Sequence, residues 1–266
     1  QKEYQIKTAK NPIFSAHSTR SEDDPIVEYD SIIVQTKTMN LDDWRRMQRF
    51  AWAIQCFHML GLLQSVAIFL RHWAKISYSN FYEELIAYGY ANPEGMVGRE
   101  LIALDKILDN VLAGKGFDQY LYEFSDISWP HEEASLLRFS ENKATLYLEL
   151  KSFIEGYLSN SGAVVDKELL EDLIRYQKEI VVNPYDKGDI EITLCANIPD
   201  YVMALRSASS ANLIRKTTTY RIIRSSNTCG GDKKLYARNI VWYGRKGGKF
   251  LYQINRPETA KNADKA

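Results

Sequence analysis

The sequence predicts a mostly α protein with a small β-containing C-terminal part, an α+β fold. Two observations predict it. Apolar residues recur at three- and four-residue spacing over much of residues 40–184, as in amphipathic helices. After Pro184, residues 190–196 instead alternate apolar and polar side chains, as in a half-buried strand. With 45% hydrophobic and 26% charged residues among 266, the chain can bury a sizeable core.

Four regions follow from this change of pattern. Residues 1–39 are predicted to be a linker, rich in turn formers over residues 1–30, with one extended segment at residues 26–38. The other three are a helical domain (residues 40–184), a small basic α+β subdomain (residues 185–256) and a disordered polar tail (residues 257–266).

The helical domain begins at Asn40, which is a predicted N-cap followed by two carboxylates that suit the helix dipole. This first helix is expected to run to about residue 57 and to be broken by Gly61. Caps, prolines and apolar spacing predict five further helices. They cover about residues 62–74, 81–88, 93–113, 131–158 and 167–182.

Residues 50–70 contain no Asp, Glu, Lys or Arg, and by length these 21 residues could span a bilayer. Polar residues such as Gln55 and His58 interrupt the segment, and Gly61 lies near its middle. We therefore expect two buried helices joined by a tight turn, and no membrane partner.

The C-terminal region is strongly basic, with 13 Lys and Arg against 3 Asp and Glu in residues 212–266. Residues 213–223 and 250–254 are expected to be extended, and residues 235–243 fit a helix or a strand. Arg245 and Lys246, just before two glycines, are candidates for contact with an anion. The alternative is a solvated turn after an aromatic anchor.

No pattern of catalytic, cofactor-binding or metal-ligating residues occurs in the sequence, so none is predicted for those roles. The three cysteines, Cys56, Cys195 and Cys229, are too scattered for a disulfide framework. Their odd number favours reduced thiols in the cytoplasm.

Trp52, Gln55 and His58 follow one another at steps of three residues, so on a helix they form an oblique ribbon. A Gln and a His within an apolar helix need hydrogen-bond partners when they are buried. Two interpretations stay open: a satisfied internal hydrogen bond, or a ribbon that faces a substrate cavity.

Four segments, spread over nearly the whole chain, give the sequence a family resemblance. They are residues 11–18 (NPIFSAHS), 43–61, 173–185 and 242–245 (WYGR). In this order they resemble the C-terminal region of cobalamin-binding-domain radical S-adenosylmethionine proteins.

The resemblance implies a longer enzyme in which a cobalamin-binding domain and a partial α/β barrel precede a helical C-terminal region. Residues 1–39 would leave the end of that barrel. A CxxxCxxC motif in the barrel would hold a [4Fe–4S] cluster that binds S-adenosylmethionine, and this sequence has no such motif. The chain is therefore expected to be a non-catalytic fragment that caps the active site of a cytoplasmic enzyme for methyl transfer or related radical chemistry.

His17 and the ribbon of Trp52, Gln55 and His58 are the candidates to line the capped cavity. The expected partners are the missing domains of the same chain and a small-molecule substrate. Two other function classes remain: a nucleic-acid-binding module built on the basic C-terminal segment, and a stand-alone helical interaction protein.

Overall fold

The computed structural model describes residues 3–19, 26–207, 209–224, 227–246 and 252–256, without the side chains of Arg245 and Lys246. It shows the predicted mostly helical α+β fold, with one sheet of two strands and one of three. The chain divides into two compact units. Unit 1 comprises Gln1–Cys56 and Tyr82–Leu136, and unit 2 comprises Phe57–Phe81 and Leu137–Ala266.

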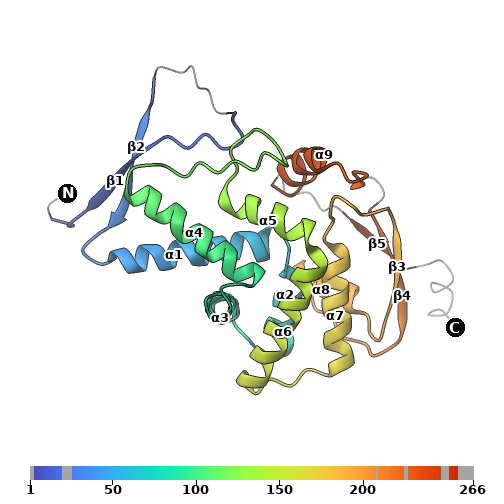
Figure 1. Cartoon of the computed structure of the whole chain (residues 1–266). Helices are drawn as coiled ribbons and strands as arrows, with labels where there is room; N and C mark the ends of the chain where they lie inside the picture. Colours follow the sequence, from blue (N-terminus) through green and yellow to red (C-terminus); the bar gives the residue numbers. More distant parts are fainter. Residues whose placement is uncertain (1–2, 20–25, 208, 225–226, 247–251, 257–266) are drawn as a thin grey trace. The chain divides into compact units, whose positions relative to one another are not determined.

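Unit 1 is built from a two-stranded sheet and several helices, of which α1 and α4 pack on the sheet. Its elements are β1 (Lys7–Pro12), β2 (Tyr29–Gln35), α1 (Leu41–Ala53), most of α3 (Tyr78–Ala91), α4 (Met96–Leu112) and the start of α5 (His131–Glu141). Helix α1 packs against α4 and β2, and α4 packs against β1 (Figure 1). The backbone of α4 approaches the end of α3 closely at Gly98. A Cβ atom added there would clash with the carbonyl oxygens of Asn92 and Gly89.

Strand β1 corrects the prediction that residues 1–30 are only a linker. It pairs antiparallel with β2, from Lys7 opposite Gln35 to Pro12 opposite Tyr29. Ala9 and Asn11 are buried while Thr8 and Lys10 are exposed, so the strand has the alternation of a half-covered sheet. The strand has only six residues, and its contacts with β2 and α4 are long-range, so no local pattern predicts it.

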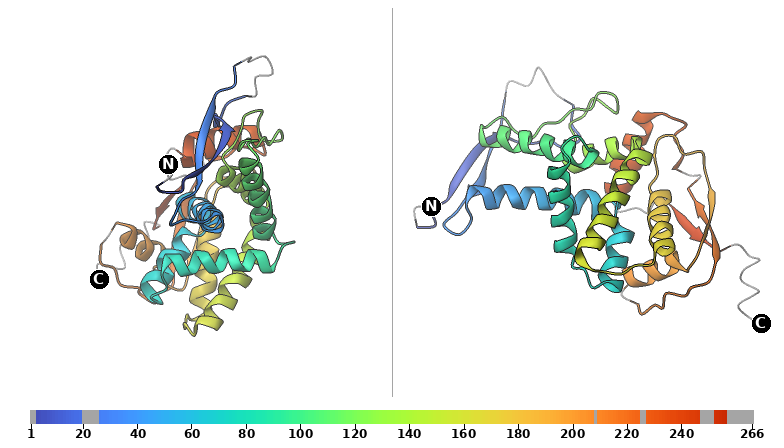
Figure 2. Two further views of the ribbon diagram at one scale, coloured as in Figure 1. Left: turned by 90° about the vertical axis from the view of Figure 1, so that its left-hand side faces the viewer. Right: turned by 60° about the horizontal axis from the view of Figure 1, so that its bottom comes forward.

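Unit 2 contains the remaining helices and the second sheet (Figures 1 and 2). Its helices are α2 (Gln64–Trp73), α6 (Lys143–Ser161), α7 (Lys167–Ile180), α8 (Ile198–Arg206) and the short α9 (Lys233–Leu235). Helix α7 contacts α2, α6 and α8. The antiparallel sheet has the order β3 (Ile190–Leu194), β4 (Thr218–Ile223), β5 (Gln253–Asn255).

The part of the chain that the structure describes includes two π-helices, η1 (Ile54–Met59) and η3 (Tyr236–Lys246). The first extends α1 and replaces the α-helical turn that was expected there. The second resolves the ambiguity over residues 235–243 in favour of a helix. The hydroxyl of Tyr236 anchors η3 by donating a hydrogen bond to the Val182 carbonyl at 2.8 Å.

Two further predictions differ from the structure. The single helix expected over residues 131–158 is two helices, because Asn142 leaves helical geometry with φ −105° and ψ 32°. Lys143 follows directly and directs its ammonium group inward to the Val181 carbonyl at 2.7 Å. Helix α8 was not predicted, although Pro199 is at its first turn.

Among the described residues, no single helix is long and apolar enough to cross a membrane; α1–η1 and α2 meet that criterion only when taken together. The break between them is at Gly61, where φ is +94°. This is the interruption that the sequence predicted.

Candidate functional site

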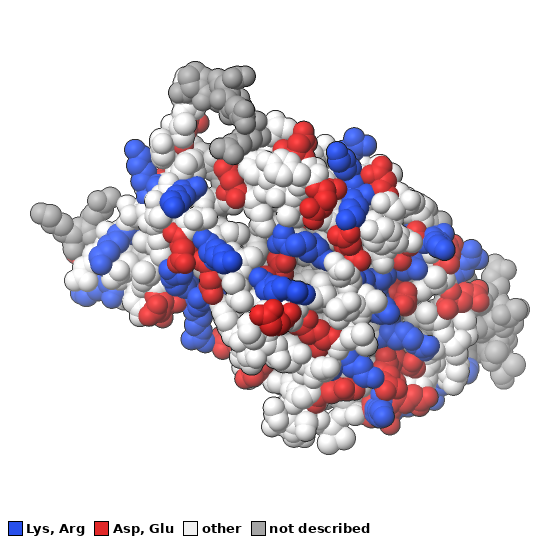
Figure 3. All heavy atoms as spheres, in the orientation of Figure 1, with Lys and Arg blue, Asp and Glu red and all other residues white. Residues whose placement is uncertain are grey.

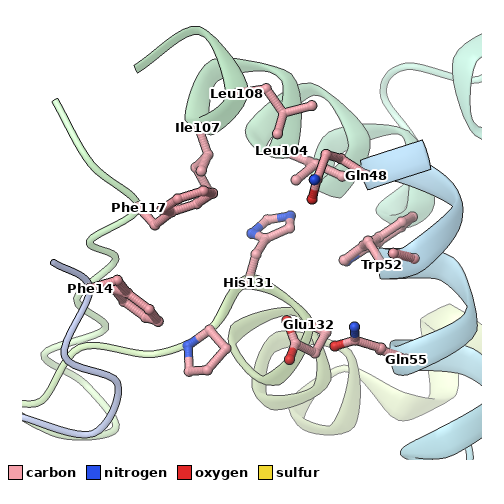
Figure 4. A pocket seen from close by; sticks show the side chains of 12 residues that line it. Phe14, Gln48, Trp52, Gln55, Leu104, Ile107, Leu108, Phe117, His131 and Glu132 are labelled. Atoms are coloured by element: carbon pink, nitrogen blue, oxygen red, sulfur yellow. The ribbon is translucent and has the colours of Figure 1, made fainter. Parts of the chain in front are cut away.

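Unit 1 contains a pocket of about 260 Å³ that its own residues line. Figure 4 shows the rings of Phe14 and Phe117 at one end, the side chains of Gln48, Trp52 and Gln55 at the other, and His131 between them. The lining residues are Phe14, Gln48, Ala51, Trp52, Gln55, Leu104, Ile107, Leu108, Phe117, Pro130, His131 and Glu132.

Helix α1 and the start of η1 supply one wall of the pocket. The helix begins with a reciprocal cap, in which Asn40 Oδ1 accepts from Asp43 N at 2.9 Å and Asp43 Oδ2 accepts from Asn40 N at 3.0 Å. Gln48, Trp52 and Gln55 are spaced by four and three residues, so they lie on one face.

A buried asparagine joins the end of α4 to the first strand and so places the two phenylalanines. Asn11 donates to the Val111 carbonyl and accepts from Gly116 N, both at 2.9 Å. The chain then carries Phe14 and Phe117 to a ring-centroid distance of 6.3 Å. They form the apolar end of the pocket.

The indole of Trp52 is held by a chain of buried hydrogen bonds. Its Nε1 donates to Ser135 Oγ at 3.0 Å, and this hydroxyl donates to Glu100 Oε2 at 2.7 Å. All three side chains are buried. Because the indole is fixed from behind, its face toward the pocket is already in place before any ligand arrives.

The imidazole of His131 is fixed in the same way. Its Nε2 lies 3.1 Å from the Glu100 carbonyl, and its Nδ1 lies 2.9 Å from Gln119 Oε1. A backbone carbonyl only accepts, so Nε2 carries a proton. The ring centroids of the imidazole and the Trp52 indole are 6.1 Å apart, and the ring planes are tilted by 31°.

His17, a predicted cavity residue, does not line the pocket. It supports the segment of Pro130, His131 and Glu132, which does line it. Its Nε2 lies 2.7 Å from Glu133 Oε2, and that carboxylate is fully buried. The His17 ring meets the Trp129 ring edge-on at 5.3 Å. His17 has a φ of +62° and donates its backbone N–H to the Ser128 carbonyl. It therefore orders the residues just before His131.

His58, the last member of the predicted ribbon, belongs to unit 2 and is not among the residues that line the pocket. Its ring meets that of Tyr78 at 5.0 Å. Burial, and then the nearby positive charge of Arg206, lower the pKa of His58. Of the four candidate cavity residues, the structure therefore places two, Trp52 and Gln55, in the pocket.

The basic C-terminal segment pairs many of its cations with carboxylates of unit 2. Arg215 pairs with Asp166 at 2.7 Å, Arg221 with Asp189 at 3.0 Å, and Arg256 with Asp200 at 2.6 Å. Figure 3 shows Lys and Arg mixed with Asp and Glu over one face of the molecule. The predicted anion contact at Arg245 and Lys246 lies outside the described side chains.

Within the described ranges, no three His, Cys, Asp or Glu side chains gather in a way that could hold a metal ion. Cys56 and Cys229 are buried and Cys195 is half-buried, and none of the three forms a disulfide. Burial raises the pKa of the Cys195 and Cys229 thiols. These thiols therefore do not form a cluster-binding set.

Sequence reasoning missed Gln48, His131 and both phenylalanines. Gln48 had a signal, because it lies one α-helical turn before Trp52. His131 had a weaker one, since it opens a helix after Trp129 and Pro130. No local pattern places His131 opposite Trp52. His131 is tied to Glu100 of α4, so its distance from Trp52 depends on how α4 packs against α1.

No family model matches the chain. The 2-(S-pantetheinyl)-carbapenam-3-carboxylate methyltransferase of Streptantibioticus cattleyicolor is 22% identical over 198 residues, which is 69% of this chain and 28% of that protein. The chain thus spans little more than a quarter of the length of this relative. It is distantly similar to part of a methyltransferase.

Proposed function

We propose that the chain is the C-terminal, active-site-capping portion of a cytoplasmic radical S-adenosylmethionine enzyme that has an N-terminal cobalamin-binding domain and performs methyl transfer or related radical chemistry. Two findings support the proposal: the likeness to a methyltransferase, and the small share of that longer protein that the chain spans. The family resemblance of the four sequence segments supplies the type of chemistry.

The pocket of unit 1 is the observation that carries the capping role. Its walls are mainly apolar, and its two aromatic polar groups, the Trp52 indole and the His131 imidazole, are fixed by hydrogen bonds. A cap over a reactive centre needs such a surface, because it displaces water and orients a substrate without moving. These residues bind, orient and exclude water; none is assigned a bond-making step.

The described residues offer no ligand set for the [4Fe–4S] cluster that the resemblance implies for the whole enzyme. The three thiols of this chain do not come together, and the described part of the chain has no other metal-binding set. In the proposal, the [4Fe–4S] cluster, S-adenosylmethionine and cobalamin are therefore held by the other domains of the full-length protein.

The enzyme class is tested on the full-length protein, purified without oxygen and supplied with reductant and methyl-labelled S-adenosylmethionine. We expect a CxxxCxxC motif to be encoded ahead of Gln1 and 5′-deoxyadenosine to be formed on reductive cleavage. A full-length protein with no such cysteine triplet and no S-adenosylmethionine cleavage would refute the proposal.

The capping role is tested with Ala51→Leu, which fills the pocket from the α1 side. We expect about tenfold less methyl transfer with an unchanged melting temperature, and more S-adenosylmethionine cleaved per methyl group transferred. Ala87→Leu is the matched control, because Ala87 is exposed on α3 and does not line the pocket. Equal behaviour of the two variants would show that the pocket has no part in turnover.

A further inference from the structure

We propose that the pocket of unit 1 selects a neutral, amide-bearing group of the methyl acceptor and seats its apolar portion against Phe14 and Phe117. The identity of the ligand as methyl acceptor rests on the proposed function. The selectivity itself follows from the lining residues and can be measured without any methyl transfer.

Two glutamine side chains offer open hydrogen-bonding groups to the pocket. Gln48 is half-buried and Gln55 is exposed, and the described structure gives neither amide group a hydrogen bond. Seven residues separate them, which is about 10 Å along a helix. Each carboxamide has two donors and one acceptor oxygen, so a pair of them complements the C=O and N–H of an extended amide.

The Trp52 indole between these glutamines and the His131 imidazole across from it are both held by hydrogen bonds. Trp52 is 4% exposed and tied to Ser135, while His131 is tied to Gln119 and to the Glu100 backbone. A flat ligand group can lie against these rings without ordering them first, which removes an entropic cost of binding.

The charges around the pocket disfavour ionic ligands. The described lining residues include no Lys or Arg, and Glu132 is their one carboxylate. An anion would lose its hydration without gaining a cationic partner. An ammonium group could reach Glu132, but the remaining wall of Leu104, Ile107 and Leu108 would strip its water. A neutral polar group avoids both costs.

The volume sets the size of the group. About 260 Å³ is below the ~300–1,000 Å³ of most sites for drug-sized ligands. The pocket therefore holds one arm of a molecule rather than a whole cofactor.

Three probes with one phenylpropyl frame test the selectivity: 3-phenylpropanamide, 3-phenylpropanoate and 3-phenylpropylammonium. Binding to the chain is followed by saturation-transfer NMR at pH 7 without S-adenosylmethionine. We expect the amide to bind at least tenfold more tightly than either charged probe. Equal or tighter binding of the carboxylate or the ammonium compound would overturn the proposal, as would no binding of the amide.

Gln48→Leu and Gln55→Leu should each weaken amide binding about tenfold, because each removes hydrogen bonds while keeping a similar side-chain volume. The matched control is Gln35→Leu, since Gln35 is half-buried on β2 and does not line the pocket. Should a leucine variant fail to fold, Gln48→Glu provides a second test: it should shift preference from the amide to the ammonium probe. Unchanged probe selectivity in the pocket variants would refute the inference.

The two proposals fail separately. Amide selectivity in a protein that never transfers a methyl group would remove the proposed enzyme and leave the pocket. Methyl transfer by the full-length protein with no amide selectivity in the pocket would refute the pocket inference and leave the proposed enzyme.

Discussion

Glutamine side chains serve opposite purposes in the two units. In unit 2, Gln177 is fully buried, accepts a hydrogen bond from Ser65 N at 2.7 Å and donates one to the Gly61 carbonyl at 2.8 Å. In unit 1, Gln48 and Gln55 face a pocket, and the described structure gives their amides no such partners. The same side chain closes a turn in one unit and stays open to a ligand in the other.

The charged groups show the same difference. Lys143, Asp186 and Arg224 form a buried network in unit 2 that also binds the carbonyls of Val181, Glu179 and Gly188. In unit 1, the buried carboxylate of Glu100 supports Ser135, which in turn holds a pocket wall. This buried network in unit 2 orders backbone, whereas the Glu100–Ser135 pair in unit 1 holds a side chain that lines the pocket.

The largest expected effect tests the closed network of unit 2. Lys143→Met removes a buried ammonium group and leaves the Val181 carbonyl and Asp186 without that donor, so we expect a loss of about 4 kcal/mol in unfolding free energy. Urea denaturation measures it. Lys151→Met, at an exposed ion pair, should change stability by less than about 1 kcal/mol. Similar losses of unfolding free energy in the two variants would contradict the distinction between a buried network at Lys143 and an exposed ion pair at Lys151.

The glutamine comparison gives the next largest effect. Gln177→Leu should cost about 3 kcal/mol, because it leaves the buried Ser65 N–H and Gly61 C=O without their partner. Gln48→Leu and Gln55→Leu should each stay within about 0.5 kcal/mol. If either variant destabilised the protein as much as Gln177→Leu, the carboxamide that it removes would be structural. The interpretation that this group is open to a ligand would then be wrong.

The support behind Trp52 is tested by Ser135→Ala. We expect a loss of about 2 kcal/mol, since Trp52 Nε1 and Glu100 Oε2 each lose a buried partner. Binding of 3-phenylpropanamide should weaken at the same time, because the indole is no longer fixed. Ser152→Ala is the control, as Ser152 is exposed and bonds only within α6. Unchanged binding in a destabilised Ser135 variant would show that the wall does not depend on this support.

The smallest effect is a pH dependence in unit 2. Burial and the charge of Arg206 lower the pKa of His58, so the unfolded chain takes up a proton near the usual value of 6.5 while the folded chain does not. This contribution to stability is therefore complete above about pH 6.5 and is lost as the pH falls through the lower folded pKa. His58→Gln should lose less stability than the wild type between pH 7 and pH 5 in thermal denaturation. An identical slope would exclude His58 as the cause.

Much of the helical framework could be predicted because its signals are local. Asn40 and Asp166 cap helices, as expected, and Gly61 ends the first helical segment. Trp52 and Gln55 are predicted together because a step of three residues places them on one oblique ribbon of a helix. His58 follows at the same spacing, but it is the fifth residue of η1, whose turns are wider than those of an α-helix, and it does not line the pocket.

The sequence by itself determined most of the helices before Pro184 and the polar interruption of an apolar run, since periodicity and capping act over a few residues. Only the tertiary structure decided which polar groups are satisfied and which stay open. Gln177 meets Gly61 across 116 positions, and Trp52 meets Ser135 across 83. Such pairs depend on helix packing, so no local pattern distinguishes a structural glutamine from one that faces a ligand.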